Sequence, residues 1–149
     1  MKHEFWEDGT KQPAVSYNIA RLDRLVSQQL GEALKPLGVS LPQFTVLSNL
    51  QRHGATANAA LAARSFTSPQ AANQIVNTMV EHGWVTKRNA PNHGRMVLIE
   101  LTGAGRELTA RCTEKAAAFE AGMLRGLTPE SVVMFKATVR RLLDNLREA

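Results

Sequence analysis

The sequence predicts a mainly α-helical fold of the α+β class with one small β-hairpin, and three observations predict it. Apolar residues recur every three or four positions through residues 15–37 and again through 132–146, the spacing of amphipathic helices. Ser-Pro and Thr-Pro pairs and single glycines punctuate the chain where helices would start and end. Only residues 84–101 carry a β-rich pattern, interrupted by the turn-forming sequence NAPNHGR. A chain of 149 residues is long enough to form a single domain with its own core.

The composition is that of a folded protein, with 44% hydrophobic and 21% charged residues. No run approaches the roughly 18 apolar residues that span a bilayer, and the first residues lack the apolar segment of a signal peptide. We therefore expect a cytoplasmic protein without a membrane partner. The single Cys112 excludes an internal disulfide and gives no metal-ligand spacing, so we expect no metal and no cofactor.

The formal net charge of +5 is unevenly distributed along the chain. Residues 1–38 hold five basic and five acidic residues, and residues 103–149 hold eight and six. Residues 39–102 hold five basic residues and only two acidic ones. A weakly basic central segment is compatible with a partner that carries phosphates, although charge alone is weak evidence.

The first predicted helix covers residues 15–37 and ends at Gly38. It has more apolar face than one small core can cover, so part of it is expected to pack against another chain. Ser40 is predicted to cap a second helix that Gly54 ends. A short third helix follows, and its cap is ambiguous between Thr56 and Asn58.

The fourth predicted helix begins at Ser68-Pro69, a cap followed by a proline, and ends at Gly83. Its predicted buried side consists of Ala72, Ile75, Val76, Met79 and Val80. Its other side carries Gln70, Ala71, Asn73, Gln74, Asn77 and Thr78. No residue from Ser68 to Val80 is charged, and Asn and Thr are mediocre helix formers. Such a face makes sense if it reads a partner.

The hairpin of residues 84–101 follows this helix directly, and its basic residues are Lys87, Arg88 and Arg95. A reading helix followed by a basic hairpin is the arrangement of a helix that enters a DNA groove with a wing beside it. Thr102 is predicted to cap the next helix, and Thr128-Pro129 to start the last. The alternating three and four spacing from Val132 to Leu146 suits packing between helices.

This order of elements resembles the MarR family of winged helix-turn-helix transcription regulators, and so do several segments. LPQFTVLSNL is similar to the family's second helix, ALAARSFTSPQAANQIVNTMVEHGWV to its helix-turn-helix, and RMVLIELTGAGREL to its return strand and the step into its fifth helix. The resemblance implies one domain over residues 1–149, with residues 39–102 as the winged helix-turn-helix and with N- and C-terminal dimerisation helices in residues 1–38 and 103–149. It also implies a homodimer on a pseudo-palindromic operator in double-stranded DNA, acting as a repressor that a small aromatic acid releases.

Two departures from the family pattern stand out. The wing of the family carries an Asp-x-Arg element, where this chain has His93, Gly94 and Arg95, so the Arg remains without its carboxylate partner. On the reading helix, Gln74 and Asn77 stand where relatives commonly place Arg. The missing carboxylate is therefore expected to reduce either the affinity for DNA or the order of the wing.

The expected DNA contacts divide by chemistry. Asn and Gln amides both donate and accept, as adenine does in the major groove, so the amide set leans towards A·T-containing half-sites. Basic side chains would contact phosphate or the narrow minor groove, and Ser68 and Arg64 are further phosphate candidates. The alternative to DNA contact is that these side chains are ordinary solvent-exposed residues of a helix and a hairpin. The expected DNA-binding residues are Ser68, Gln70, Asn73, Gln74, Asn77, Lys87, Arg88, Arg95 and Arg64.

An effector pocket is expected where the first, second and fifth helices meet the reading domain. The polar candidates there are Tyr17, Arg21, Arg52, His53 and Arg111, all of which can equally be ordinary surface or interface residues. Cys112 is a candidate redox sensor, but its place on an apolar stripe favours an inert small hydrophobe.

No catalytic constellation is found, since the four histidines are scattered and no nucleophile or phosphate-binding motif occurs. We therefore expect no enzyme. The alternative function is a winged-helix protein-interaction module with weak or lost DNA binding, which the altered wing and the uncharged reading helix motivate.

Overall fold

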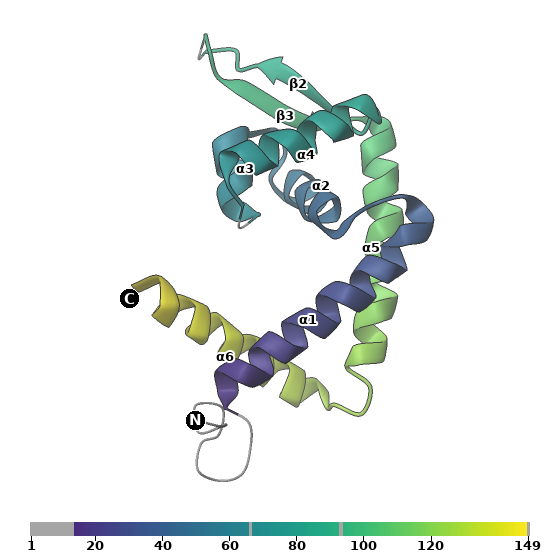
Figure 1. The fold of residues 1–149 in the computed structure, drawn as a ribbon, viewed down its shortest axis with the longest axis vertical. Coiled ribbons are helices and arrows are strands. Elements are labelled where there is room, and N and C mark those ends of the chain that lie inside the picture. The colour runs from purple at the N-terminus through teal and green to yellow at the C-terminus, as the bar shows by residue number, and fades with distance from the viewer. Residues whose placement is uncertain (1–13, 66, 93, 149) are drawn as a thin grey trace, which may run out of the picture. The chain divides into compact units, whose positions relative to one another are not determined.

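The computed structural model describes residues 14–65, 67–92 and 94–148, and two compact units divide the chain between Ala116 and Ala117. Figure 1 shows the succession of helices and strands. In the first unit the elements are α1 (Val15–Leu34), a short 3₁₀ turn (Lys35–Leu37), α2 (Leu41–His53), β1 (Thr56–Ala57), α3 (Asn58–Arg64), α4 (Pro69–Glu81), β2 (Val85–Asn89) and β3 (Val97–Leu101). Helix α5 (Gly103–Met123) contains the boundary, and α6 (Pro129–Glu148) belongs to the second unit. The predicted mainly helical fold with a winged helix-turn-helix is confirmed.

The predicted helix starts at Ser40 and Ser68 are confirmed. The Ser40 hydroxyl accepts from the Gln43 amide, and the Gln43 side chain accepts from the Ser40 backbone N–H, a reciprocal capping box. The Ser68 hydroxyl accepts from the Ala71 amide at 3.1 Å. These caps satisfy backbone N–H groups that the first turn of a helix leaves unpaired.

Helix α3 is not capped by either predicted residue. Its N-cap is Ala57, which makes no side-chain cap bond, and Asn58 is already the first helical residue. Thr56 is instead buried, and its hydroxyl donates to the Gly54 carbonyl at 2.8 Å. Thr56 and Ala57 form strand β1, which the sequence analysis missed.

The predicted hairpin is present, and it belongs to a three-stranded antiparallel sheet in the order β1-β3-β2. Along β2, Val85 pairs with Leu101, Lys87 with Ile99, and Arg88 with Leu98. Successive strand residues point to opposite faces, so Lys87 lies on the face of the buried Val85 and Ile99, and Arg88 lies on the other face.

The core of the first unit joins the wing to the helices around it. Its central members come from α2, α3, α4, the sheet and the start of α5. The end of α1 contributes the fully buried Leu34. The buried cluster consists of Leu34, Val39, Val46, Leu47, Leu50, Leu61, Val76, Met79, Val85, Ile99, Leu101, Leu108 and Cys112.

The end of α4, the wing and the start of α5 are joined by hydrogen bonds and close packing. The Thr102 hydroxyl donates to the Gly83 carbonyl and accepts from the Gly105 amide at 3.0 Å, confirming Thr102 as a cap. The Thr102 amide donates to the Trp84 carbonyl at 3.0 Å. Gly105 is buried, and a Cβ at this position would collide with that same Trp84 carbonyl. Only glycine lets the first turn of α5 approach the wing this closely.

Helix α6 of the second unit begins with the predicted Thr128 cap, whose hydroxyl accepts from the Ser131 amide at 3.2 Å. No residue of α6 is buried, and several large apolar side chains on it are exposed. Among the described helices, none is long and apolar enough to cross a membrane.

Candidate nucleic-acid interface

Helix α4 has one anchored face and one free face. Ala72, Val76 and Met79, spaced at intervals of four and three, are fully buried and fix the helix on the core. Ile75 is half-buried. Val80 is 40% exposed, so its predicted burial is wrong. Val80 follows the buried Met79 directly, and one residue rotates the helix by about 100°, which places its side chain at the edge of the core-facing side.

The free face carries the predicted amide side chains. Gln70, Asn73, Gln74 and Asn77 are all exposed, with the helical spacing that places them along one stripe. No charged side chain interrupts them within α4 before Glu81. Ser68 stands at the N-terminal end, where unpaired N–H groups and the helix dipole favour an anion.

Lys87 of strand β2 reaches this stripe. Its ammonium donates to Asn77 Oδ1 at 2.6 Å and to Asn73 Oδ1 at 3.3 Å. All three residues were predicted to lie at the DNA surface, but this contact between the wing and the reading helix was not predicted.

Arg88, the next residue along β2, has a different partner. Its Nε lies 2.8 Å from Glu100 Oε2, and both side chains are more than 40% exposed. Arg88 opposes Leu98, two residues from Glu100 on the same face of the hairpin, so the ion pair is a diagonal cross-strand contact. The charge that Arg88 offers to DNA is therefore partly neutralised.

Arg95 lies in the turn between β2 and β3 and is exposed. Within the described part of the chain it makes no hydrogen bond and no ion pair, which leaves its guanidinium available to a partner. His93, the altered wing position beside it, lies outside the described residues. Arg64 is likewise exposed, in the last turn of α3.

The five predicted effector residues are all exposed. Tyr17 and Arg21 meet, with the guanidinium carbon 5.6 Å from the ring centroid, a cation–π distance. Arg52 and His53 lie in the last turn of α2, and Arg111 lies on α5 beside the buried Cys112. Burial raises the pKa of the Cys112 thiol, and nearby Arg111 opposes the shift.

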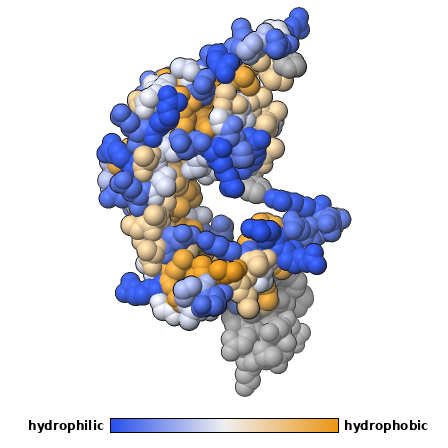
Figure 2. Space-filling model, turned by 180° about the vertical axis from the view of Figure 1, so that it is seen from behind, coloured by the Kyte–Doolittle hydropathy of each residue, from blue (hydrophilic) through white to orange (hydrophobic). Residues whose placement is uncertain are grey.

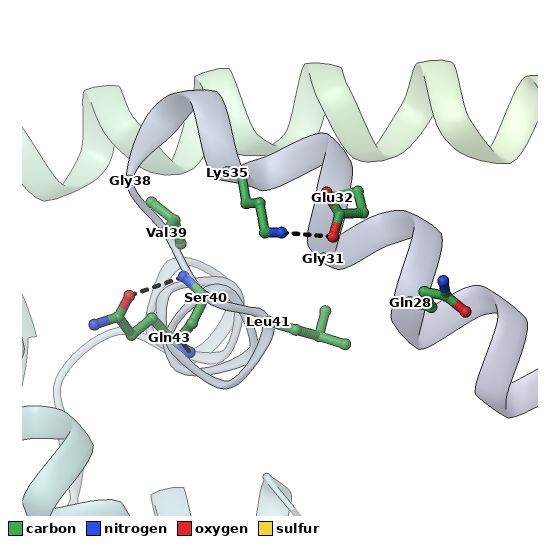
Figure 3. A pocket seen from close by; sticks show the side chains of 9 residues that line it. All are labelled: Gln28, Gly31, Glu32, Lys35, Gly38, Val39, Ser40, Leu41 and Gln43. Carbon is green, nitrogen blue, oxygen red and sulfur yellow. Dashed lines mark hydrogen bonds and ion pairs between the residues drawn. The ribbon is translucent and has the colours of Figure 1, made fainter.

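A pocket of about 490 Å³ lies between the second half of α1 and the start of α2, and none of the five residues lines it. Figure 3 shows its polar side chains, including Lys35, whose ammonium is 2.6 Å from a Glu32 carboxylate oxygen. The pocket is lined by Gln28, Gly31, Glu32, Lys35, Gly38, Val39, Ser40, Leu41 and Gln43. The sequence signal that could have indicated this pocket is the pair Gly31 and Gly38, because residues without a side chain leave space beside the Lys35 ammonium. Elsewhere in the described residues, no group of three or more His, Cys, Asp or Glu is arranged to hold a metal.

The geometry and the comparisons with known proteins agree. A model of the MarR family matches residues 37–96, which span α2 to the end of the wing turn. The HTH-type transcriptional repressor Rv2887 of Mycobacterium tuberculosis is 29% identical over 128 residues, covering 86% of this chain and 92% of the repressor.

Two solved structures are similar over most of their length. A MarR mutant from Escherichia coli complexed with operator DNA has a TM-score of 0.79 at 22% identity, covering 87% of this chain and 93% of that one. Rv2887 in complex with salicylic acid has a TM-score of 0.71 at 28% identity, covering 89% and 98%.

A three-stranded wing beside a helix with a free amide face, held on a shared core, defines a winged helix-turn-helix DNA-binding protein. The winged helix-turn-helix of this chain matches the MarR family, a family of DNA-binding transcription regulators that are not enzymes, and most of the chain is similar to repressors of this kind.

Proposed function

We propose that this regulator is a homodimeric repressor of a pseudo-palindromic operator, released by a small aromatic acid. The observation that carries the proposal is the uncharged, exposed amide stripe of α4, together with the exposed Arg95 of the wing turn, which has no ion-pair or hydrogen-bond partner among the described residues. Such a helix offers base-reading groups, and the wing offers a cation.

We assign the reading of DNA bases to α4, and contacts with the sugar–phosphate backbone of DNA to residues next to α4. Gln70 and Gln74 make no side-chain hydrogen bond within the described structure, so both ends of each amide are available to a base edge. Asn73 and Asn77 complete the stripe. Ser68 at the helix N-terminus and Arg64 contact phosphate, and Arg95 enters the minor groove, where a negative potential favours arginine.

Homodimerisation is supported by large apolar side chains that are exposed on α1 and on α6. Figure 2 shows that hydrophobic residues form part of the surface. A folded monomer rarely exposes so many large apolar groups on two helices. On α1 they are Val15 (66% exposed), Ile19, Leu22 and Leu25, and on α6 they are Val133, Met134 (71%), Phe135, Leu143 and Leu146 (77%). We assign dimerisation to the N- and C-terminal segments, residues 1–38 and 103–149.

A gel shift with DNA from the region flanking the protein's own gene tests the central claim. Salt-sensitive binding of one dimer to a two-fold symmetric site is expected, with the mass determined by light scattering. A specific dimer should place its two α4 helices about 34 Å apart, one duplex turn. Absence of any salt-sensitive binding would instead favour the alternative, a winged-helix module that binds another protein.

The effector proposal rests on the pocket beside Lys35. Its volume of about 490 Å³ lies within the usual range for small-ligand sites, and it combines a cation with the apolar Val39 and Leu41. A ligand carboxylate would compete with Glu32 for the Lys35 ammonium. Rv2887, a relative with 28% identity, has been solved with salicylic acid bound, which supports this ligand class.

Titrating salicylate into the protein–operator complex tests the site. Lys35→Met is expected to raise the salicylate concentration needed for release by roughly tenfold, the effect of losing a charge-assisted bond. Glu32→Gln should lower it, because Lys35 then lacks its internal partner. Arg21→Met, which removes a cation on α1 outside the pocket, is the matched control. A larger effect of Arg21→Met than of Lys35→Met would move the site to the Tyr17–Arg21 pair.

A further inference from the structure

Lys87 is the one side chain of the described wing strands found bonded to the reading helix. It lies on the hairpin face shared with the buried Val85 and Ile99, and from there its ammonium reaches Asn77 at 2.6 Å and Asn73 at 3.3 Å. These asparagines are four residues apart, on successive turns of the same helix face. One cation thus bridges two members of the proposed reading stripe.

The chemistry of the ammonium fixes the orientation of both amides. A lysine side chain has three donors and no acceptor, whereas an asparagine amide has an accepting oxygen and a donating NH₂. Only the oxygens can therefore face Lys87. The NH₂ group of each amide is directed away from the oxygen by the planar geometry of the group, leaving it free to donate elsewhere.

This orientation changes what the two asparagines can read. An asparagine reads adenine by accepting from N6 and donating to N7 at once, which requires both ends of the amide to face the same base. An amide whose oxygen is turned towards a wing lysine offers only its donors. Guanine N7 and O6 and thymine O4 match a donor-only amide, whereas adenine presents its N7 acceptor beside an N6 donor that such an amide cannot satisfy.

We infer that Lys87 is a specificity-determining residue that holds Asn73 and Asn77 as donors only, so that these positions select guanine or thymine instead of the adenine expected from their residue type. The inference rests on the proposed operator binding of α4. Lys87 acts here as a positioning residue, through the asparagines. Gln70 and Gln74, which have no such partner among the described residues, keep both functions and remain adenine readers.

Selection of preferred sites from random DNA tests the inference, with the wild-type protein and three variants at Lys87 and Arg88. Lys87→Met keeps the length and the aliphatic stem of the side chain but removes the donors. Lys87→Arg keeps the charge and the donors. Arg88→Met removes one positive charge from the adjacent position, on the opposite face, where the partner is Glu100 and not an asparagine.

The wild type and Lys87→Arg should prefer guanine or thymine at the bases contacted by Asn73 and Asn77, which Asn73→Ala and Asn77→Ala locate. Lys87→Met should shift these positions towards adenine by about tenfold in relative affinity, within the discrimination of one bidentate pair. Arg88→Met should lose affinity for all sites equally and keep the wild-type preference.

Three results separate the possible failures. Specific binding with adenine preferred at these positions in the wild type would overturn the inference, because it would mean that DNA displaces Lys87 from the amides. An identical preference in the wild type and Lys87→Met would overturn it as well. Absence of specific sites for every variant, the wild type included, would overturn the proposed operator binding together with the inference built on it.

Discussion

The hydroxyl of Thr102 donates to the backbone carbonyl of Gly83 at 2.6 Å and so ties the start of α5 to the end of the reading helix. The same oxygen accepts from the Gly105 amide, which makes Thr102 both a helix cap and a bracket. The two roles need a hydroxyl, and the shape of the side chain is secondary.

Thr102→Val is therefore expected to lower the free energy of unfolding by about 1–2 kcal/mol, the cost of a lost cap together with an unpaired carbonyl. Thr102→Ser keeps the hydroxyl and should lose less than half as much. Urea denaturation followed by circular dichroism measures both. Equal losses in the two variants would show that the methyl group, and not the hydroxyl, stabilises the junction.

Gly105 and Gly31 are both helical glycines, and replacing them by alanine should have opposite effects. At Gly105 a Cβ collides with the Trp84 carbonyl, a backbone atom that cannot move without shifting the wing. We expect Gly105→Ala to destabilise the protein by more than about 2 kcal/mol, as overpacking does. At Gly31 a Cβ meets no atom within 4 Å, so Gly31→Ala should stabilise α1 by about 0.5–1 kcal/mol. Thermal unfolding of the two variants side by side decides the matter, and a shift of the same sign in both would contradict the prediction.

Arg95 and Arg88 are expected to contribute unequally to DNA binding. Arg95 is exposed in the wing turn and has no ion-pair partner among the described residues, whereas Arg88 is paired with Glu100. Arg95→Ala should weaken binding to every sequence and reduce the slope of log K against log salt by about 0.9, the value for one phosphate contact. Arg88→Ala should have a smaller effect, because Glu100 already offsets its charge. Fluorescence anisotropy across a salt series gives both slopes, and an unchanged slope for Arg95→Ala would mean that the altered wing does not touch DNA.

Cys112 is expected to be chemically inert in the folded protein. It is fully buried, and burial raises the pKa of its thiol, so little reactive thiolate is present at neutral pH. Reaction with Ellman's reagent should be slow in buffer and rapid in denaturing urea. Fast labelling of the native protein would restore the redox-sensor hypothesis.

The raised pKa of the Cys112 thiol also predicts that the stability of the protein depends on pH. A thiol whose folded-state pKa is raised favours the neutral form, so its contribution is present at neutral pH and is lost as the pH rises into the alkaline range above the ordinary thiol pKa. Unfolding free energies measured across this range should fall more steeply for the wild type than for Cys112→Ala. Parallel pH profiles would contradict this assignment.

Local signals in the sequence were sufficient for the wing and for the starts of α2, α4 and α5, but not for the start of α3. Ser40, Ser68 and Thr102 each indicate the start of a helix, because each hydroxyl accepts a hydrogen bond from the backbone N–H three residues later. Strand β1 could not be predicted in this way. The strand is only two residues long, Thr56 and Ala57, and it forms because β3 supplies a pairing partner more than 40 residues later in the chain.

The candidate site was predictable as a set of residues but not as a set of contacts. The amides of α4 and the basic residues of the hairpin were identifiable from residue type and helical spacing. The bonds from Lys87 to two asparagines, and from Arg88 to Glu100, depend on strand register and on the packing of the wing against α4. Two neighbouring cations therefore acquire different partners, a distinction that their sequence positions alone do not reveal.

The position of Lys87 has a consequence for how operators diverge between related regulators. If a strand residue orients the amides of α4, one substitution in the wing can retune the preferred operator while every side chain in the groove stays the same. Two paralogues with identical recognition helices can then control different sets of genes. A recognition code for this fold that is read from the helix alone would assign them the same target, so strand position 87 belongs in such a code.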